Sequence, residues 1–208
     1  AGGAVPVVAG TVEGVGTGSV QPVIPNVKTD LSKVDLTTLS QPQLARMMQE
    51  RVLDWALASH DTKAGNFLIT TDGNVVGIDK DQALKFIGSD SLATTYKPNP
   101  SPQVYGALFE LFFQKKLNLP IGSMLPAIEK IEAMSADAWL ANLGPYLGTK
   151  GGSVAELNKL KNAILLRKMN LRTDLQEFLT QALRLRGDIG PKDTFEFAPG
   201  ALPKKKRK

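Results

Sequence analysis

The sequence predicts an α+β fold that is predominantly α-helical and contains one small β-hairpin. Apolar residues recur at helical spacing over about 41–58 and again from about 103 to 187. Between these regions, two short apolar runs flank Asp72-Gly73, a dipeptide typical of tight hairpin turns. The 208 residues provide for one domain of ordinary size, or for a small domain with tails.

The first helix has the clearest start signal. Ser40 is a good N-cap, Pro42 suits the first turn, and the helix is expected over about 41–58. The hairpin strands are expected at 66–69 and 75–78. Three helices should follow 103, and one or two long helices should end near Gly187. The two tryptophans lie on apolar helical faces and are predicted to be core residues.

Composition excludes several classes of protein. The chain has no Cys, which excludes a disulfide scaffold, an iron–sulfur site and a thiol enzyme. It has one His, His60, which excludes metal sites built from several histidines. No apolar run reaches the roughly 18–20 residues that a membrane-spanning helix requires, so no membrane partner is expected.

The positive charge is concentrated at the C-terminus. The net charge is +5, and the last five residues, Lys204, Lys205, Lys206, Arg207 and Lys208, are all basic. Without them the chain has 25 − 5 = 20 basic residues against 20 acidic ones, so a nucleic-acid-binding body is not supported.

This basic run follows Pro203 and matches a nuclear-import signal, whose partner would be an import receptor. The tail would then direct the protein to the nucleus of a eukaryotic cell, including a host cell, and otherwise the protein would be cytoplasmic. A solubilising or RNA-contacting tail and an engineered tag are the alternatives.

The chain divides into three parts by composition. Residues 1–39 are predicted to be a flexible leader rich in Gly, Pro and Val, residues 40–187 form the domain, and residues 188–208 form an extended tail. The glycine-rich run 14–19 lacks the Lys-Ser/Thr of a phosphate-binding loop.

Residues 60–79 contain the side chains best suited to catalysis and metal binding. Asp61, Lys63 and Asn66 lie in one short loop, and the hairpin should bring Asp79 back beside them. Asn66 and Asp79 offer hard oxygen ligands that suit Mg²⁺. Asp61 could accept a hydroxyl proton, and Lys63 could contact transferring phosphate oxygens.

This run resembles the catalytic loop and metal-binding segment of the protein-kinase-like superfamily. Asp61 and Asn66 have the spacing of the kinase catalytic Asp and Asn, and the hairpin then leads to Ile78-Asp79. The sequence is most similar to the phosphoinositide-kinase-like, HipA-like and aminoglycoside-phosphotransferase-like branches.

The resemblance implies a kinase-like C-lobe, with the N-lobe missing or rudimentary, that uses ATP and Mg²⁺. Asp61 would be the catalytic base and Lys63 the γ-phosphate contact, with Asn66 and Asp79 as the Mg²⁺ ligands. The phosphoacceptor would be a protein or a small molecule, and the chain would suit an effector or toxin acting on a host target.

The chain departs from the kinase pattern at three points. His60 directly precedes Asp61 with no Arg between them, Asp79 is followed by Lys80-Asp81, and only 60 residues precede Asp61. A catalytically incomplete, pseudokinase-like interaction module that needs a partner or a lost N-lobe is therefore the alternative. An ordinary helix–loop–hairpin with solvated polar residues, and a helical nucleic-acid-associated protein inferred from the tail, also stay open.

Overall fold

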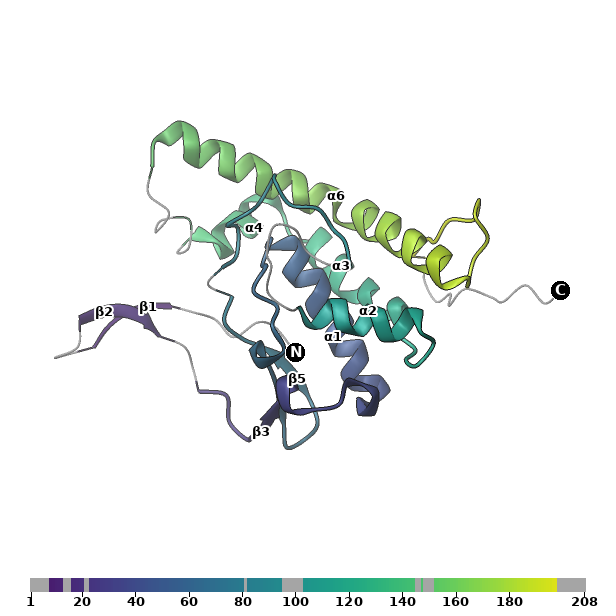
Figure 1. Ribbon diagram of the computed structural model, residues 1–208. Helices are drawn as coiled ribbons and strands as arrows, with labels where there is room; N and C mark the ends of the chain where they lie inside the picture. The colour runs from purple at the N-terminus through teal and green to yellow at the C-terminus, as the bar shows by residue number, and fades with distance from the viewer. Residues whose placement is uncertain are drawn as a thin grey trace.

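The computed structural model describes residues 8–12, 16–20, 23–80, 82–94, 103–144, 147 and 152–197. It confirms an α+β fold in which helices pack beside a small three-stranded antiparallel sheet (Figure 1). The identity of this fold with a kinase C-lobe stays a prediction.

The helices lie close to where the sequence predicts them. The helices in the order of the chain are α1 (Gln41–Ala56), α2 (Val104–Phe113), α3 (Leu125–Glu132), α4 (Ala136–Asn142) and α6 (Val154–Arg186). In α1, the Ser40 hydroxyl accepts from the Gln43 backbone N–H, and the Gln43 side chain accepts from the Ser40 N–H. The last region is one helix of 33 residues, which Gly187 ends in the left-handed conformation at φ 78°.

The predicted hairpin forms the middle and one edge of the sheet. Strand β4 (Phe67–Thr70) pairs with β5 (Val75–Gly77), and Gly73 adopts φ 84° in the turn between them. A third strand, β3 (Val27–Asp30), pairs antiparallel with the other side of β4, giving the order β3-β4-β5. The sequence analysis did not anticipate this strand.

The structure therefore differs from the predicted boundary at residue 39. Beyond β3, two 3₁₀ turns (Leu31–Lys33 and Leu36–Thr38) are capped by the side chains of Asp30 and Asp35, and Leu31 and Leu39 are buried in the core. The packed domain thus includes residues from Val27 onward. Upstream, β1 (Val8–Val12) and β2 (Gly16–Val20) form a separate two-stranded antiparallel sheet. The flexibility predicted for 1–39 stays a prediction.

Helix α1 lies at the centre of the core. It contacts β5, the 3₁₀ turn Ile121–Met124, α3 and α6, and α6 runs across the other helices in Figure 1. The apolar face predicted from its periodicity is buried except at its end, with Leu44, Met47, Met48 and Val52 at 0% exposure and Leu57 partly buried. Trp55 and Trp139 are both buried, which confirms their assignment to the core.

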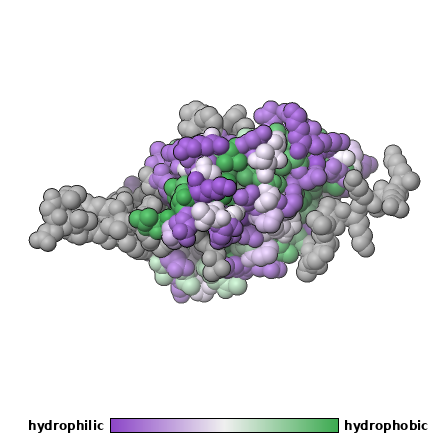
Figure 2. All heavy atoms as spheres, turned by 90° about the horizontal axis from the view of Figure 1, so that it is seen from below, coloured by the Kyte–Doolittle hydropathy of each residue, from purple (hydrophilic) through white to green (hydrophobic). Residues whose placement is uncertain are grey.

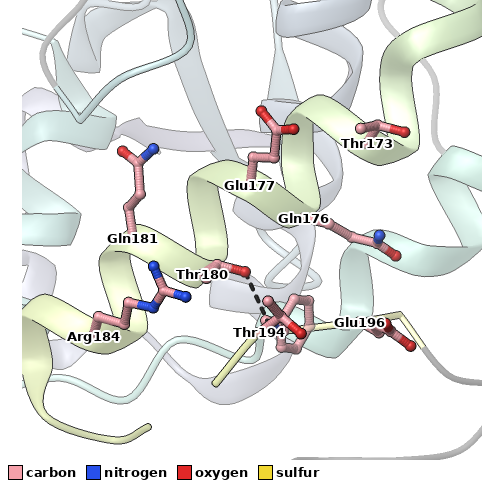
Figure 3. Close-up of a pocket in the computed structure, with 9 residues that line it drawn as sticks. Thr173, Gln176, Glu177, Thr180, Gln181, Arg184, Thr194 and Glu196 are labelled. Carbon is pink, nitrogen blue, oxygen red and sulfur yellow. Dashed lines mark hydrogen bonds between the residues drawn. The ribbon is translucent and has the colours of Figure 1, made fainter. Parts of the chain in front are cut away.

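The segment after α6 docks back on that helix. The Phe195 N–H donates to Thr180 Oγ1 (2.9 Å) and the Phe197 N–H donates to Gln176 Oε1 (3.1 Å), while both phenyl rings are buried. Figure 3 shows Thr194 and Glu196 beside α6 and the hydrogen bond that Thr180 accepts. These residues line a cavity of about 410 Å³. Part of the predicted tail is thus attached to the domain. The basic residues 204–208, and with them the predicted import signal, lie outside the described residues.

One face of the protein is polar in most places. Figure 2 shows hydrophilic residues over much of one face, with smaller hydrophobic areas between them. Within the described ranges, no helix has both the length and the apolar character needed to cross a membrane.

Candidate functional site

The loop between α1 and β4 holds three of the four predicted site residues. The Asn66 Nδ2 group donates to the backbone oxygen of Asp61 (2.9 Å), and the Asn66 backbone N–H donates to the Lys63 oxygen (2.9 Å). The backbone bond belongs to the 3₁₀ turn Ala64–Asn66, and the side-chain bond ties that turn to Asp61. Because Asn66 uses its amide nitrogen to hold the loop, its side-chain oxygen is the atom that a bound cation would contact.

The hairpin returns Asp79 to this loop, as predicted. Residue Gly77 pairs with Phe67, and the Ile78 N–H donates to the Asn66 backbone oxygen (2.9 Å). Asp79 follows in the left-handed conformation at φ 55°, which Asp adopts more readily than most residues. The strand pairing thus places Asp79 directly after the residue that is bonded to Asn66.

Lys63 lies between the two carboxylates. Its Nζ is 3.0 Å from Asp61 Oδ2 and 4.0 Å from Asp79 Oδ2. The exposed fractions of the side chains are 19% for Asp61, 53% for Lys63 and 42% for Asp79, so an external molecule can reach all three. The structure therefore gathers Asp61, Lys63 and Asp79 at one accessible site, and the buried Asn66 is bonded to the same loop.

The donor set is sparse for a metal ion. Among the described residues, no group of three or more Asp, Glu or His side chains is arranged to hold one. One carboxylate and one amide oxygen fit Mg²⁺ only where phosphates and waters complete its coordination. The residues present thus fit a metal that arrives with a nucleotide.

A buried ion cluster anchors the chain immediately after Asp79. Lys80 Nζ lies 2.6 Å from Asp54 Oδ1 and 3.7 Å from Glu50 Oε2, and the Tyr105 hydroxyl donates to Asp54 Oδ2 (2.7 Å). Burial acts to lower the pKa of Lys80, but Asp54 and Glu50 outweigh it and raise that pKa. Burial raises the pKa of Glu50. The cluster thus holds a charged lysine inside the domain, next to a candidate metal ligand.

Gly77 is required for this cluster to fit against β5. A Cβ at this position would collide with Glu50 Oε2 and lie 2.9 Å from Lys80 Nζ, both of which are fixed by their ion pairs. Gly77→Ala should therefore lower the free energy of unfolding by about 1–3 kcal/mol, as overpacking does. Urea denaturation measures this. Gly144→Ala is the control, since a Cβ there meets nothing within 4 Å and should change stability little.

A second buried cluster fixes the other end of the loop and was missed by the sequence analysis. His60 is buried, and its Nε2 lies 2.9 Å from Asp90 Oδ2. Arg167 of α6 binds both oxygens of Asp90, donates to the Trp55 backbone oxygen (3.0 Å) and stacks on the Trp55 ring at 3.6 Å. Because Asp90 and Arg167 are 77 residues apart, no local pattern indicates the pair.

Comparisons of this chain with protein-family models, with curated proteins and with solved structures found no match. The chemistry of the site is therefore inferred from its own residues.

Proposed function

We propose that this chain is a module for ATP- and Mg²⁺-dependent phosphoryl transfer. The observation that carries the proposal is the arrangement of Asp61 and Asp79 on either side of Lys63 Nζ, at 3.0 and 4.0 Å. A cation between two accessible carboxylates suits phosphoryl transfer. One carboxylate can accept the proton of a hydroxyl, and the other can bind a metal ion that also binds phosphate. The resemblance of residues 60–79 to kinase-like enzymes supports the same function.

Each residue has a separate role in this proposal. Asp61 accepts the proton of the attacking hydroxyl as its oxygen bonds to the γ-phosphorus, the bond from that phosphorus to the β–γ bridging oxygen breaks, and ADP leaves. Lys63 contacts the γ-phosphate oxygens, and Asn66 and Asp79 would hold Mg²⁺. When bound, Mg²⁺ supplies positive charge that neutralises the phosphate oxygens. The acceptor hydroxyl belongs to a protein or a small molecule, as expected of an effector or toxin.

The two aspartates should separate binding from transfer. Asp79→Asn should abolish the thermal stabilisation by Mg-ATP, because it removes the metal's carboxylate while Asn tolerates the left-handed backbone. Asp61→Asn should keep that stabilisation and lower ATP turnover by about 10²–10⁴-fold, the usual contribution of a general base. Its backbone oxygen still accepts from Asn66. Thermal shift with millimolar Mg-ATP and an ADP-release assay measure the two effects.

Asp137→Asn is the matched control, since Asp137 is exposed on α4, away from the loop. It should change neither readout. If the wild-type chain shows no shift with Mg-ATP, the nucleotide site is not complete in this chain. The alternative function, a pseudokinase-like interaction module, then replaces the proposed enzyme activity. Equal loss of binding in both aspartate variants would contradict the separate roles.

A further inference from the structure

A groove lined by none of the candidate site residues lies between α1, α3 and α4. Its volume is about 550 Å³, within the range of small-molecule sites. Most of its lining is apolar. Leu53 and Leu57 contribute side chains from α1 and its C-terminal end, and Ile131 and Met134 contribute them from α3 and the turn after it. The groove thus suits a ligand with an apolar body.

Hydrogen-bond donors gather on the α3–α4 side of this groove. Trp139 is only 4% exposed, and its Nε1 is buried without an acceptor among the described residues. Asn142, one turn further along α4, donates to the sulfur of Met134 at 3.8 Å. A buried indole N–H without an acceptor is costly, so the Trp139 N–H would gain from an oxygen of a ligand. The Asn142 amide, exposed and bonded to a weak sulfur acceptor, can donate to the same oxygen.

The charges of the lining favour an anionic ligand. The groove is lined by two cations, Arg46 and Lys130, and one carboxylate, Glu50. Glu50 is already compensated, because Arg46 Nη2 lies 2.6 Å from its Oε1 and Lys80 lies 3.7 Å from its Oε2. Lys130, an exposed residue in the last turn of α3, is then the cation available to a ligand.

We infer that this groove binds a small apolar carboxylate. The carboxylate accepts hydrogen bonds from the Trp139 indole and the Asn142 amide and faces Lys130. The hydrocarbon part covers Leu53 and Leu57 of α1. This site is independent of the proposed phosphoryl transfer, since it shares none of Asp61, Lys63, Asn66 or Asp79.

Octanoate is the probe, and the indole N–H resonances of the ¹⁵N-labelled full chain are the readout. The chain has two tryptophans, so Trp139→Phe assigns both signals. Octanoate should move the Trp139 indole proton downfield in a saturable titration and leave the Trp55 signal in place, because the Trp55 Nε1 already donates to Asp174 (3.0 Å).

The role of charge is tested in two ways, by changing the charge of the ligand and by removing the charge of Lys130. Octan-1-ol and octyltrimethylammonium should bind at least about tenfold more weakly than octanoate, as expected when a charge-assisted hydrogen bond is lost. Lys130→Gln should weaken octanoate severalfold, whereas Lys116→Gln, at an exposed lysine outside the groove, should not. Since Lys130 is on the surface, this variant tests the site even if Trp139→Phe fails to fold.

Three results would overturn the inference. Octanol binding as tightly as octanoate would show an apolar groove with no carboxylate site. An absence of saturable shifts would show that water alone satisfies the indole. A Trp139 signal that moves with protein concentration, without octanoate, would show that a second copy of the chain covers the groove.

Discussion

Asp90→Ala should lower the free energy of unfolding by about 3–5 kcal/mol, the usual cost of removing one partner of a buried ion pair. The Asp90 side chain is 0% exposed and binds both His60 and Arg167. Its removal leaves the guanidinium of Arg167 buried without its carboxylate, against the ring of Trp55. For a domain of this size the melting temperature should fall by on the order of 10 °C.

The same cluster gives this loss a defined pH dependence. Burial acts to raise the pKa of Asp90, but the hydrogen bonds and charges of His60 and Arg167 outweigh it and lower that pKa. A carboxylate whose folded pKa is lowered contributes stability above its unfolded pKa, about 3.9, and loses it as the pH falls through the folded pKa. The stability difference between wild type and Asp90→Ala should therefore be complete near neutral pH and shrink below about pH 4.

Urea denaturation of both proteins at pH 7 and at about pH 3 measures the effect. Asp137→Ala, at an exposed aspartate in the first turn of α4, should cost no more than about 1 kcal/mol, the contribution of a charge to a helix terminus. A loss in Asp90→Ala as small as that control would mean that the cluster adds no net stability.

Elements with local signals could be predicted from the sequence. Ser40 and Pro42 mark the start of α1, and Asp72-Gly73 marks the hairpin, because capping and turn chemistry depend on neighbouring residues. The candidate site could also be predicted for this reason. Asp61, Lys63 and Asn66 share one short turn, and a two-strand hairpin of known register carries the chain to Asp79.

The rest depends on partners that are far apart in the chain. Strand β3 pairs with β4 about 40 residues later, and a run as short as Val27–Asp30 has no alternation that identifies it as a strand. The ion pairs that support the site also join residues far apart in the chain. Lys80 pairs with Asp54 across 26 residues, and Arg167 pairs with Asp90 across 77. Burial of these charged residues follows from tertiary packing, which no local sequence pattern indicates.

Lys80→Met should lower the free energy of unfolding by about 3–5 kcal/mol, because it removes the cation of a buried ion pair. Met is similar in length, but it leaves Asp54 and Glu50 buried without Lys80. Burial already raises the pKa of Glu50 while the charge of Lys80 acts to lower it, so the loss of Lys80 should raise that pKa further. A carboxyl group whose folded pKa is raised contributes stability below its unfolded pKa and loses it as the pH rises through the folded pKa. The destabilisation of Lys80→Met should therefore be larger at pH 7 than at pH 4, which is the same direction as the trend expected for Asp90→Ala. Urea denaturation at both pH values measures it.

Lys80→Met also connects the core to the candidate site. Lys80 is the next residue after Asp79, which holds a left-handed backbone at φ 55° that most side chains avoid. With Lys80 no longer held by Asp54, that backbone can relax and Asp79 moves relative to Asn66. If the proposed phosphoryl transfer is right, Lys80→Met should weaken Mg-ATP binding at temperatures where the variant is still folded, although Asp79 itself is unchanged. Lys116→Met, at an exposed lysine, should alter neither stability nor binding. A folded Lys80→Met variant that binds Mg-ATP like wild type would show that the ion cluster stabilises the domain without positioning Asp79.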